Sequence, residues 1–577
     1  MAINDRFQEL ILEYVCKDAH NEELPGILST LRQVSSQKLG KRVVANDITR
    51  EDNVESLLDI AATGFMGIDI PKGYGGFGGN YLDYLMGIVT IGQYSGDQST
   101  TLDIEISHVV QSIIRSNANS KQKKKYLRRL AQGFVQKKPF SKTTVNGGIN
   151  YNGVELVISS FAQTEEKHGS DAQNLECTLA EDEGNKDNVI VNGRKIYITN
   201  GAKAGFTIVN TNEAVGENGK AIIQPHGEPR LTSIIVENNS KGHIIGQREI
   251  TMGHTSSVTA ERAYNNVSVS KSNIIGERGK GFKYFMQGLD EGRYGISASV
   301  TGGLAYVLDR TRERVLERYQ FGKPIIEFPQ VREKLAFLEQ VVLASKLMLY
   351  NGAMSVDKKL PISYHAAITK HFVTKYGSKA SEDAIQVFGG EGYLAETGIE
   401  RCKRDTILGL IGEGTDDIIK MVISRNLLKN GKQTDEVSNR LSNYSYETGS
   451  EEERLYKGIK LSEEIVSSCV ENLKVKTDAA YFNMLGDMDS LVEATKALFD
   501  FALVLKSKGQ NEWDRVFAMA QRMGMEMANK VALNSNQFLL RNEQEPMYDA
   551  SKIYINNRIK LEDRIVKPYL PQQKLVN

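Results

Sequence analysis

The chain has 577 residues, a length that predicts about three or four domains at ~150 residues each and a core large enough to hold an internal ligand cavity. Its 72 lysines and arginines balance 72 aspartates and glutamates, so no net field attracts a polyanion and nucleic acid is disfavoured as a partner. The four cysteines are far apart and form no CxxC pair, which argues against a zinc site or a disulfide framework and for structural thiols in a reducing compartment: Cys16, Cys177, Cys402 and Cys469.

Residues 1–144 are predicted to form a helical domain. Apolar residues recur at helical spacing from MAINDRFQELILEYVCKDAH onward, and one glycine-rich loop, GFMGIDIPKGYGGFGG, interrupts the pattern. The N-terminal segment lacks the basic start and apolar core of a secretory signal, and no stretch approaches the ~18 apolar residues that would span a bilayer. We therefore expect a cytoplasmic protein without a membrane span.

Residues 145–276 have a different texture, with short β-branched runs such as LTSIIVE separated by Asn/Gly turns, and they predict a small antiparallel β domain. Helical periodicity returns over 277–430 and predicts a helical bundle. A polar linker, NGKQTDEVSNRLSNYSYETGSEEE, then begins a helical extension over 431–577. Because no GxGxxG follows a strand and no βαβ alternation occurs, a Rossmann nucleotide site is not indicated.

The clearest local signal lies in NVIVNGRKIYITNG, where Asn192-Gly193 favours a type I′ hairpin between two β-branched strands. Strand alternation would point the two isoleucines of KIYITNG to one side and present Tyr197 and Thr199 together on the other, ~7 Å apart. A flat heteroaromatic ligand could stack and hydrogen-bond there. The same pattern also fits a half-exposed strand with ordinary polar residues facing outward.

A second segment, FAQTEEKHGSDAQNLECT, offers hydroxyls at Thr164 and Ser170 and a close backbone approach at Gly169. Further motifs follow in order: NIIGERGKGFKYFMQGLDEGR, RYQFGKPIIEFPQV, DAIQVFGGEGYLAETGIERCKRD and EGTDDI. With TEEKHGSD and KIYITNG they resemble the acyl-CoA dehydrogenases, which are FAD-dependent flavoproteins, over roughly residues 40–430. The C-terminal extension and the EGTDD ending, close to the EGTND of very-long-chain enzymes, make that branch the nearest likeness.

The resemblance implies the acyl-CoA dehydrogenase fold, which is mainly α with a central β domain. In this chain it would comprise an N-terminal helical domain (1–144), a middle β-barrel or sandwich that carries the flavin ring site (145–276), a C-terminal four-helix bundle (277–430) and an additional helical domain (431–577). In the family, FAD lies between the β domain and the bundle, and a neighbouring subunit supplies part of its site. A homo-oligomer is thus implied, with a dimer expected.

The family's FAD contacts carry over to matching positions. By the resemblance, Tyr197 would stack on the flavin ring, Thr199 would bond its N5, and Ser170 would lie near the cofactor pyrophosphate and the substrate. Other expected contacts are Phe161 and Thr164 along the isoalloxazine, Arg318, Phe321, Gln330, Gln386, Gly389 and Gly390 toward the partner subunit's FAD, and Thr415 and Asp417 beside the flavin.

Glu413, in LIGEGTDDII, matches the catalytic base of the family. Removing a proton α to a thioester requires a base near that carbon and stabilisation of the developing enolate oxygen. By the resemblance, Arg293 lies behind the base and Asp290 lies near the substrate. Some relatives place the base directly before that arginine; because Gly292 occupies this position here, Glu413 is the expected base and Glu291 is the alternative.

Three positions depart from the family pattern. Gly412 stands where most relatives carry Tyr or Phe before the base, which opens the wall beside the thioester and could admit a branched or α-substituted acyl group. Glu166 replaces a common proline and His254 replaces a common arginine, so the substrate contacts there stay open. We interpret His254 as a surface-loop histidine.

The predicted reaction is α,β-desaturation of an acyl-CoA to the trans-2-enoyl-CoA, as in fatty acid β-oxidation. Electron-transferring flavoprotein is the expected oxidant, and oxygen is the alternative. Two further hypotheses remain: a dehydrogenase of acyl or aminoacyl groups tethered to a carrier protein in biosynthesis, and a non-catalytic family member that acts as an assembly or binding protein.

Overall fold

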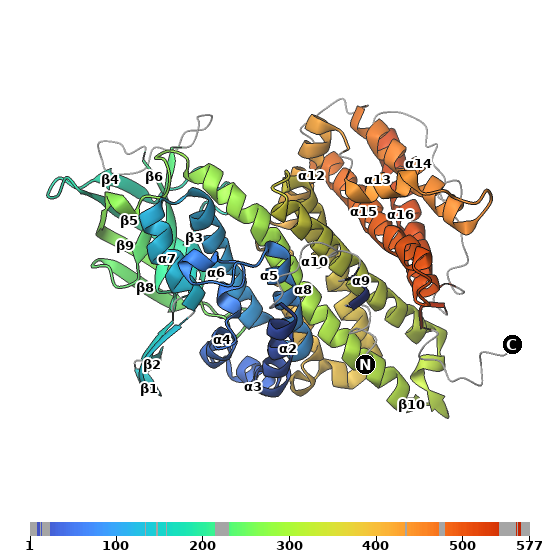
Figure 1. Ribbon diagram of the computed structural model, residues 1–577, viewed down its shortest axis with the longest axis horizontal. Coiled ribbons are helices and arrows are strands. Elements are labelled where there is room, and N and C mark those ends of the chain that lie inside the picture. Colours follow the sequence, from blue (N-terminus) through green and yellow to red (C-terminus); the bar gives the residue numbers. More distant parts are fainter. Residues whose placement is uncertain are drawn as a thin grey trace. The chain divides into compact units, whose positions relative to one another are not determined.

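A computed structural model of the chain describes residues 9–11, 13, 24–132, 134–145, 148–156, 158–213, 230–432, 435–471, 479–541, 561 and 564–566 (Figure 1). The chain divides into two compact units, one of His20–Ser299 and the other of Val300–Asn577 with Met1–Ala19. The division falls inside the long helix α8 (Gly281–Glu317).

The first unit begins with helices and turns to strands. Its helices are α2 (Leu24–Val34), α3 (Gly40–Thr49), α4 (Val54–Ala61), α5 (Tyr81–Ser95), α6 (Gln98–Asn117) and α7 (Ser120–Gln132). A capping box starts α5, because Asn80 Oδ1 accepts from the Asp83 backbone N–H at 2.9 Å and Asp83 Oδ2 accepts from the Asn80 N–H at 3.0 Å. Nearly all of α5 and α6 is buried, so these two helices form the centre of the helical part.

The β domain of this unit is built on a seven-stranded sheet with the order β3-β6-β4-β5-β9-β8, in which β7 also pairs with β6. Its strands are β3 (Ser159–Ala162), β4 (Thr178–Glu181), β5 (Asn188–Thr199), β6 (Phe206–Asn212), β7 (Leu231–Glu237), β8 (His243–Arg248) and β9 (Thr259–Ser270). A separate antiparallel pair joins β1 (Phe134–Val145) to β2 (Gly148–Leu156). The sheet is not wholly antiparallel as expected, because β6 runs parallel to β3 and to β4.

The predicted hairpin at Asn192-Gly193 is wrong. Strand β5 runs through this dipeptide without turning, because β9 pairs with both halves of it. A bulge absorbs the irregularity: Gly193 has φ 140° and Asn266 on β9 has φ 50°. A Cβ at position 193 would lie 2.6 Å from the Cα of Cys177, so the glycine permits a close approach of two backbones.

The second unit contains the C-terminal half of α8 and a bundle of α9 (Pro329–Asp357), α10 (Ser363–Phe388), α11 (Ile399–Gly409) and α12 (Asp416–Asn430). Two glycines let these helices approach closely. A Cβ on Gly377 would lie 2.7 Å from Leu304 Cδ1, and one on Gly409 would lie 2.8 Å from Thr374 Cγ2. A proline at the first turn of α9 starts that helix at no cost in hydrogen bonds.

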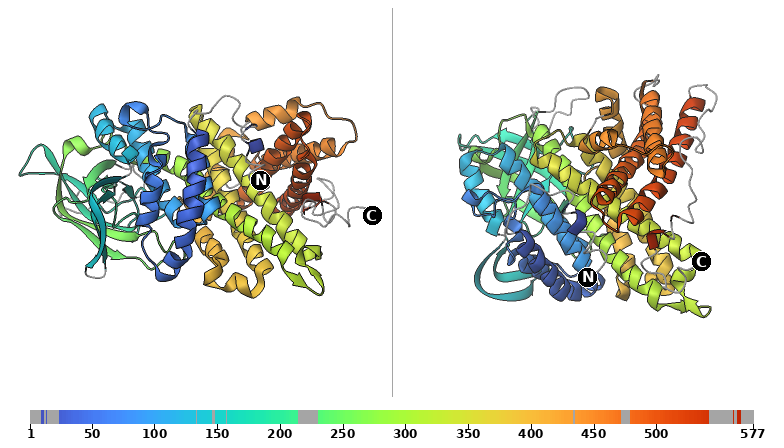
Figure 2. Two further views of the ribbon diagram at one scale, coloured as in Figure 1. Left: turned by 60° about the horizontal axis from the view of Figure 1, so that its bottom comes forward. Right: turned by 45° about the vertical axis from the view of Figure 1, so that its right-hand side comes forward.

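The extension adds α13 (Glu436–Asn443), α14 (Glu451–Glu471), α15 (Ala479–Ser507) and α16 (Trp513–Arg541), which Figure 2 shows in orange and red beside the yellow bundle helices. The segment predicted as a polar linker therefore contains a helix, α13, whose N-cap Asp435 accepts from the Ser438 backbone N–H at 2.7 Å. Helix α15 packs against α12, since Ser424 Oγ donates to the Phe482 carbonyl at 2.9 Å.

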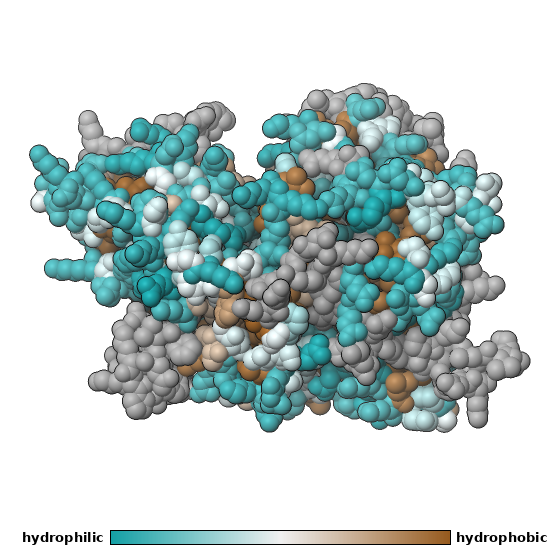
Figure 3. Space-filling model, in the orientation of Figure 1, coloured by the Kyte–Doolittle hydropathy of each residue, from teal (hydrophilic) through white to brown (hydrophobic). Residues whose placement is uncertain are grey.

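In the part of the chain that the structure describes, no helix is both long and apolar enough to cross a bilayer. The face of the molecule in Figure 3 is mostly hydrophilic, with hydrophobic side chains in small scattered groups.

Candidate active site

The exposed side of β5 presents an aromatic ring. Lys195 pairs with Arg262 and Ile198 pairs with Ala260, so two residues of β5 oppose one of β9 and form a second bulge. Tyr197 lies in this bulge with φ 57° and with 63% of its surface exposed. Strand alternation predicted that Tyr197 faces outward, and its side chain is exposed. The bulge, which alternation does not predict, places its backbone in the left-handed region.

The turn after β3 lies beside this bulge. The carbonyl of Thr164 accepts from the Ile196 backbone N–H at 2.9 Å, which brings Thr164 next to Tyr197. Phe161 on β3 is half-buried and stacks on Phe285 with centroids 5.5 Å apart and an interplanar angle of 9°. Thr199, half-buried, ends β5, and Ser170 is exposed in the turn. The structure thus brings Thr164 next to the exposed ring of Tyr197, with Thr199 two residues further along the same strand.

A buried ion pair that sequence reasoning missed holds this turn in place. Lys195 Nζ lies 2.7 Å from Glu165 Oε1, and the two side chains are 0% and 3% exposed. Nζ also donates to the Gln163 carbonyl at 3.0 Å, while Glu165 accepts the backbone N–H groups of Glu176 at 2.5 Å and Cys177 at 3.0 Å. The only sequence signal for it was a lysine inside a β-branched run, which alone does not name its partner.

The residues expected near the substrate on α8 are already engaged with each other. Arg293 is 2% exposed and donates to Asp290 Oδ1 at 2.6 Å. Glu291, the alternative base, lies 3.1 Å from Arg115, which also binds the buried Asp69 at 2.7 Å. Because its carboxylate is paired with an arginine of α6, this contact favours a structural role for Glu291.

Asp69 lies in the loop before α5, and its carboxylate binds three side chains of α6: Arg115, His108 and Gln111. His108 Nε2 lies 2.8 Å from its Oδ2, and Gln111 donates to its Oδ1 at 2.6 Å. Burial raises the pKa of Asp69, but the charges and hydrogen bonds of His108, Arg115 and Gln111 outweigh burial and hold the pKa well below its usual range.

Glu413 lies on the turn between α11 and α12. It is half-buried and has φ 55°, in the left-handed region that glycine prefers, and the next residue, Gly414, has φ 103°. The backbone N–H of Asp416 closes the turn on the Leu410 carbonyl at 2.9 Å. A Cβ on Gly412 would meet nothing closer than the Leu408 carbonyl at 3.4 Å, so the chain itself does not require a glycine there.

The two other residues expected beside the flavin start α12. Thr415 is the half-buried N-cap residue of this helix. The Asp417 side chain is 78% exposed and lies 3.1 Å from Lys420 Nζ. Thr415 therefore ends the turn that carries Glu413, and Asp417 lies in the first turn of α12.

The positions expected to reach a partner subunit's cofactor are exposed on the second unit. Phe321 and Gly322, with φ 51° and 78°, form the two-residue loop between β10 (Tyr319–Gln320) and β11 (Lys323–Pro324). Phe321 is 92% exposed, although an aromatic residue ordinarily buries its ring. The other positions, also exposed, are Arg318, Gln330, Gln386, Gly389 and Gly390.

The two adjacent glycines leave open space. Among the described residues, and apart from its own chain neighbours, nothing lies within 4 Å of a Cβ built on Gly389 or on Gly390. An exposed guanidinium, an exposed ring and such open backbone fit the pyrophosphate and adenosine parts of a dinucleotide brought from outside this unit.

The structure also tests the sequence-based interpretations of His254 and of the cysteines. His254 is 4% exposed with φ 49°, so it is a buried residue and its interpretation as a surface-loop histidine is wrong. Cys177, Cys402 and Cys469 are buried free thiols, and burial raises the pKa of Cys177 to about 12, which fits a structural role. Cys16 lies outside the described residues.

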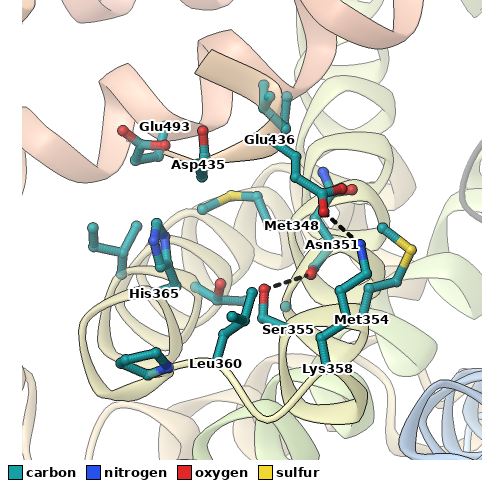
Figure 4. Close-up of a pocket in the computed structure, with 16 residues that line it drawn as sticks. Met348, Asn351, Met354, Ser355, Lys358, Leu360, His365, Asp435, Glu436 and Glu493 are labelled. Carbon is teal, nitrogen blue, oxygen red and sulfur yellow. Dashed lines mark hydrogen bonds and ion pairs between the residues drawn. The ribbon is translucent and has the colours of Figure 1, made fainter. Parts of the chain in front are cut away.

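A separate cavity of about 240 Å³ lies in the second unit between α9 and α10 on one side and α13 and α15 on the other (Figure 4). At one end, ligand atoms of His365, Asp435 and Glu493 lie within 4.8 Å of one another, as in a metal site. Lys496 Nζ lies 2.9 Å from Glu493 Oε1 and 3.8 Å from Asp435 Oδ1. Because this lysine already supplies the positive charge, we assign no metal to the cluster.

A helical domain, a β domain with an exposed aromatic ring, and a bundle that carries a glutamate on a left-handed turn agree with the flavin-dependent thioester dehydrogenases that the sequence resembles. Family models of the acyl-CoA dehydrogenase N-terminal, middle and C-terminal domains match residues 21–134, 160–267 and 279–428. The chain belongs to the acyl-CoA dehydrogenase family. It is an FAD-dependent oxidoreductase that acts on CH–CH bonds, as predicted.

Two curated proteins illustrate the relationship. The chain is 32% identical over 383 residues to the probable acyl-CoA dehydrogenase YngJ of Bacillus subtilis, covering 66% of this chain and 92% of that protein. It is 30% identical over 411 residues to a probable short/branched chain specific acyl-CoA dehydrogenase of Dictyostelium discoideum, covering 71% and 91%. The very-long-chain branch is not confirmed, because the relatives that match are of short/branched-chain and other types.

Solved structures extend the likeness to the C-terminal helices. An acyl-CoA dehydrogenase from Bacillus anthracis, complexed with FAD, matches 96% of this chain and 95% of its own with a TM-score of 0.78 at 20% identity, so the two share a fold that includes the extension. A prolyl acyl carrier protein oxidase matches 71% of this chain and all of its own with a TM-score of 0.62 at 25% identity.

Proposed function

We propose that the protein desaturates an acyl-CoA between Cα and Cβ and that Glu413 removes the α proton. The observation that carries the proposal is the turn of Glu413, where a non-glycine residue keeps a left-handed backbone between two helices of the bundle. Such strained positions persist where the surrounding structure enforces them, and they are common at active sites.

The chemistry divides between this carboxylate and the cofactor. Glu413 acts as the general base and takes the proton from Cα. Hydrogen bonds to the developing enolate oxygen would stabilise the negative charge that this proton transfer creates. FAD, when bound, supplies the acceptor for the hydride that leaves Cβ. Arg293, neutralised by Asp290 at 2.6 Å, gives the substrate region a buried polar support without a net charge.

We propose that the exposed face around Tyr197 holds the flavin ring, with Phe161, Thr164, Ser170 and Thr199 as its other contacts. Within the second unit, Thr415 and Asp417 follow the base at the start of α12 and would lie beside the flavin. The exposed positions Arg318, Phe321, Gln330, Gln386, Gly389 and Gly390 would contact FAD of a second subunit, and the protein would be a homodimer. Their exposure supports this assignment: Phe321 is 92% exposed at the hairpin tip although its ring contacts Phe328, and Arg318 is exposed just before β10.

The acyl group is the least constrained part of the proposal. The lack of a side chain at Gly412, beside the expected base, favours a branched or α-substituted chain, and the match to a short/branched chain relative agrees with it. The very-long-chain hypothesis rests on the extension and the EGTDD motif. A series of straight and branched acyl-CoAs of different lengths separates the two.

A second candidate is the desaturation of an acyl or aminoacyl group carried by a carrier protein. The structural likeness to a prolyl acyl carrier protein oxidase favours it. We propose electron-transferring flavoprotein as the oxidant for the acyl-CoA reaction and oxygen for the carrier-protein reaction, and a cytoplasmic location for both.

The test is an anaerobic titration of the purified, FAD-loaded protein with acyl-CoAs and, separately, with acyl and prolyl carrier proteins. Bleaching of the oxidised flavin band by one thioester class identifies the carrier. Glu413→Gln should abolish bleaching, while the matched change Glu291→Gln should preserve it, because Glu291 is paired with Arg115. Bleaching that survives in Glu413→Gln and disappears in Glu291→Gln would assign the base to α8 instead.

A further inference from the structure

Two consecutive residues of α10 hold the turn that carries Glu413. Lys370 Nζ donates to the Gly414 carbonyl at 2.6 Å. His371 Nδ1 lies 2.5 Å from Oδ1 of Asp416, the first residue of α12. The turn is thus attached to α10 on the residue after Glu413 and again two residues further on.

His371 lies between two carboxylates. It is fully buried, and its second nitrogen, Nε2, lies 3.1 Å from Asp487 Oδ1. Each ring nitrogen of His371 thus lies within hydrogen-bond distance of one carboxylate oxygen, and the two aspartates together fix the orientation of the ring. Burial raises the pKa of Asp416 and of Asp487, but the hydrogen bonds and charges of His371 and neighbouring lysines outweigh it and hold both pKa values well below the usual range.

Asp487 belongs to the extension, on α15. Lys375 of α10 and Lys530 of α16 also bind its carboxylate, the latter at 3.0 Å. One residue earlier, Gly486 faces α12: a Cβ there would lie 2.7 Å from Lys420 Cγ. Lys420 in turn binds Asp416 at 3.0 Å. The extension therefore reaches the first turn of α12 by a charged route and by direct packing.

The turn has a physical need for such support. A non-glycine residue in the left-handed region is strained, and the glycines on both sides of Glu413 restrain it little. A carboxylate that removes a proton from carbon must also be held close to a single geometry, since a displacement of ~1 Å can cost ~100-fold in rate.

We propose that His371 and Asp487 are positioning residues for the base, so that the C-terminal extension contributes to the active site by fixing the turn of Glu413. The inference rests on the proposed function of Glu413. Both act through other groups and not on the reacting atoms: His371 holds the start of α12, and Asp487 holds the orientation of the His371 ring.

The test uses the FAD-loaded, full-length protein and the thioester that bleaches its flavin. Asp487→Asn keeps the size of the side chain and removes its charge. Asp489→Asn is the matched control, because Asp489 lies on the same helix and is fully buried, but its carboxylate accepts from Lys432 at 2.8 Å and from the Tyr364 hydroxyl instead of from His371. Stopped-flow measurement of flavin bleaching is made with substrate carrying hydrogen or deuterium at Cα.

Asp487→Asn should slow bleaching at saturating substrate about 10-fold with unchanged half-saturation, and should enlarge the α-deuterium isotope effect, because proton removal becomes more limiting. Asp489→Asn should change neither. If Asp487→Asn fails to retain FAD, Asp416→Asn breaks the same link from the bundle side and should give the same result.

Wild-type rates and isotope effect in both Asp487→Asn and Asp416→Asn would overturn the inference, as would equal slowing by Asp489→Asn. These outcomes differ from a failure of the proposed function, in which no thioester bleaches the wild-type flavin at all.

Discussion

Replacing Lys195 by methionine should loosen the face of the β domain that we propose binds the flavin, without removing any group expected to touch the flavin. The change leaves the Glu165 carboxylate buried, at 3% exposure, without the ammonium that lies 2.7 Å from it. Breaking a buried ion pair from one side costs ~3–5 kcal/mol. Two backbone N–H groups still bind the carboxylate, so we expect the lower end, about 3 kcal/mol.

The assay is urea-induced release of flavin, followed by its fluorescence. With an m-value of ~2 kcal/mol/M, a loss of about 3 kcal/mol lowers the midpoint by about 1–2 M. The turn of Thr164 should also lose its fixed position beside Tyr197, so the FAD content of the purified variant should fall. A chain of several domains does not unfold in one step, and flavin release therefore reports this domain better than a global signal.

Two further variants make the reasoning refutable. Arg194→Met removes a charge from the neighbouring exposed pair with Glu261, whose arginine is 60% exposed, and should change the midpoint little. The double variant Lys195→Met/Glu165→Gln removes the stranded charge but keeps an acceptor for the backbone N–H groups, and should recover part of the loss. Equal midpoints for Lys195→Met and Arg194→Met would refute the argument from burial.

Two other predictions concern stability. Burial raises the pKa of Asp435, but Lys496 and the Ser438 hydrogen bonds outweigh it and lower the pKa to about 2; the stabilisation, about 2 kcal/mol, is complete above pH ~5 and is lost as pH falls from ~4 through 2. Between pH 7 and about pH 3 the urea midpoint should fall less in Asp435→Asn than in wild type, and an equal fall in both proteins would contradict this assignment. Gly193→Ala should destabilise the β domain by more than ~1 kcal/mol, because φ is 140° and the new Cβ meets the Cys177 backbone at 2.6 Å; a midpoint of flavin release equal to wild type would show that the strands can separate without cost.

The sequence predicted what depends on neighbours in the chain. The family motifs predicted the order of helical, β and helical domains, and the family models match in that order. Tyr197 was expected to face outward and is 63% exposed. The glycines on both sides of Glu413 indicated a carboxylate on a flexible turn before a helix, and Glu413 lies on the turn between α11 and α12.

Tertiary structure decided what depends on residues far apart in the chain. The Asn192-Gly193 dipeptide favours a hairpin by itself, but β9 pairs along the whole of β5 and keeps the strand extended. Lys195 finds Glu165 across 30 positions, and His371 finds Asp487 across 116. Local backbone preferences are set by a few adjacent residues, whereas the partner of a buried charge is set by which segments the fold brings together, so no spacing in the sequence could reveal these pairs.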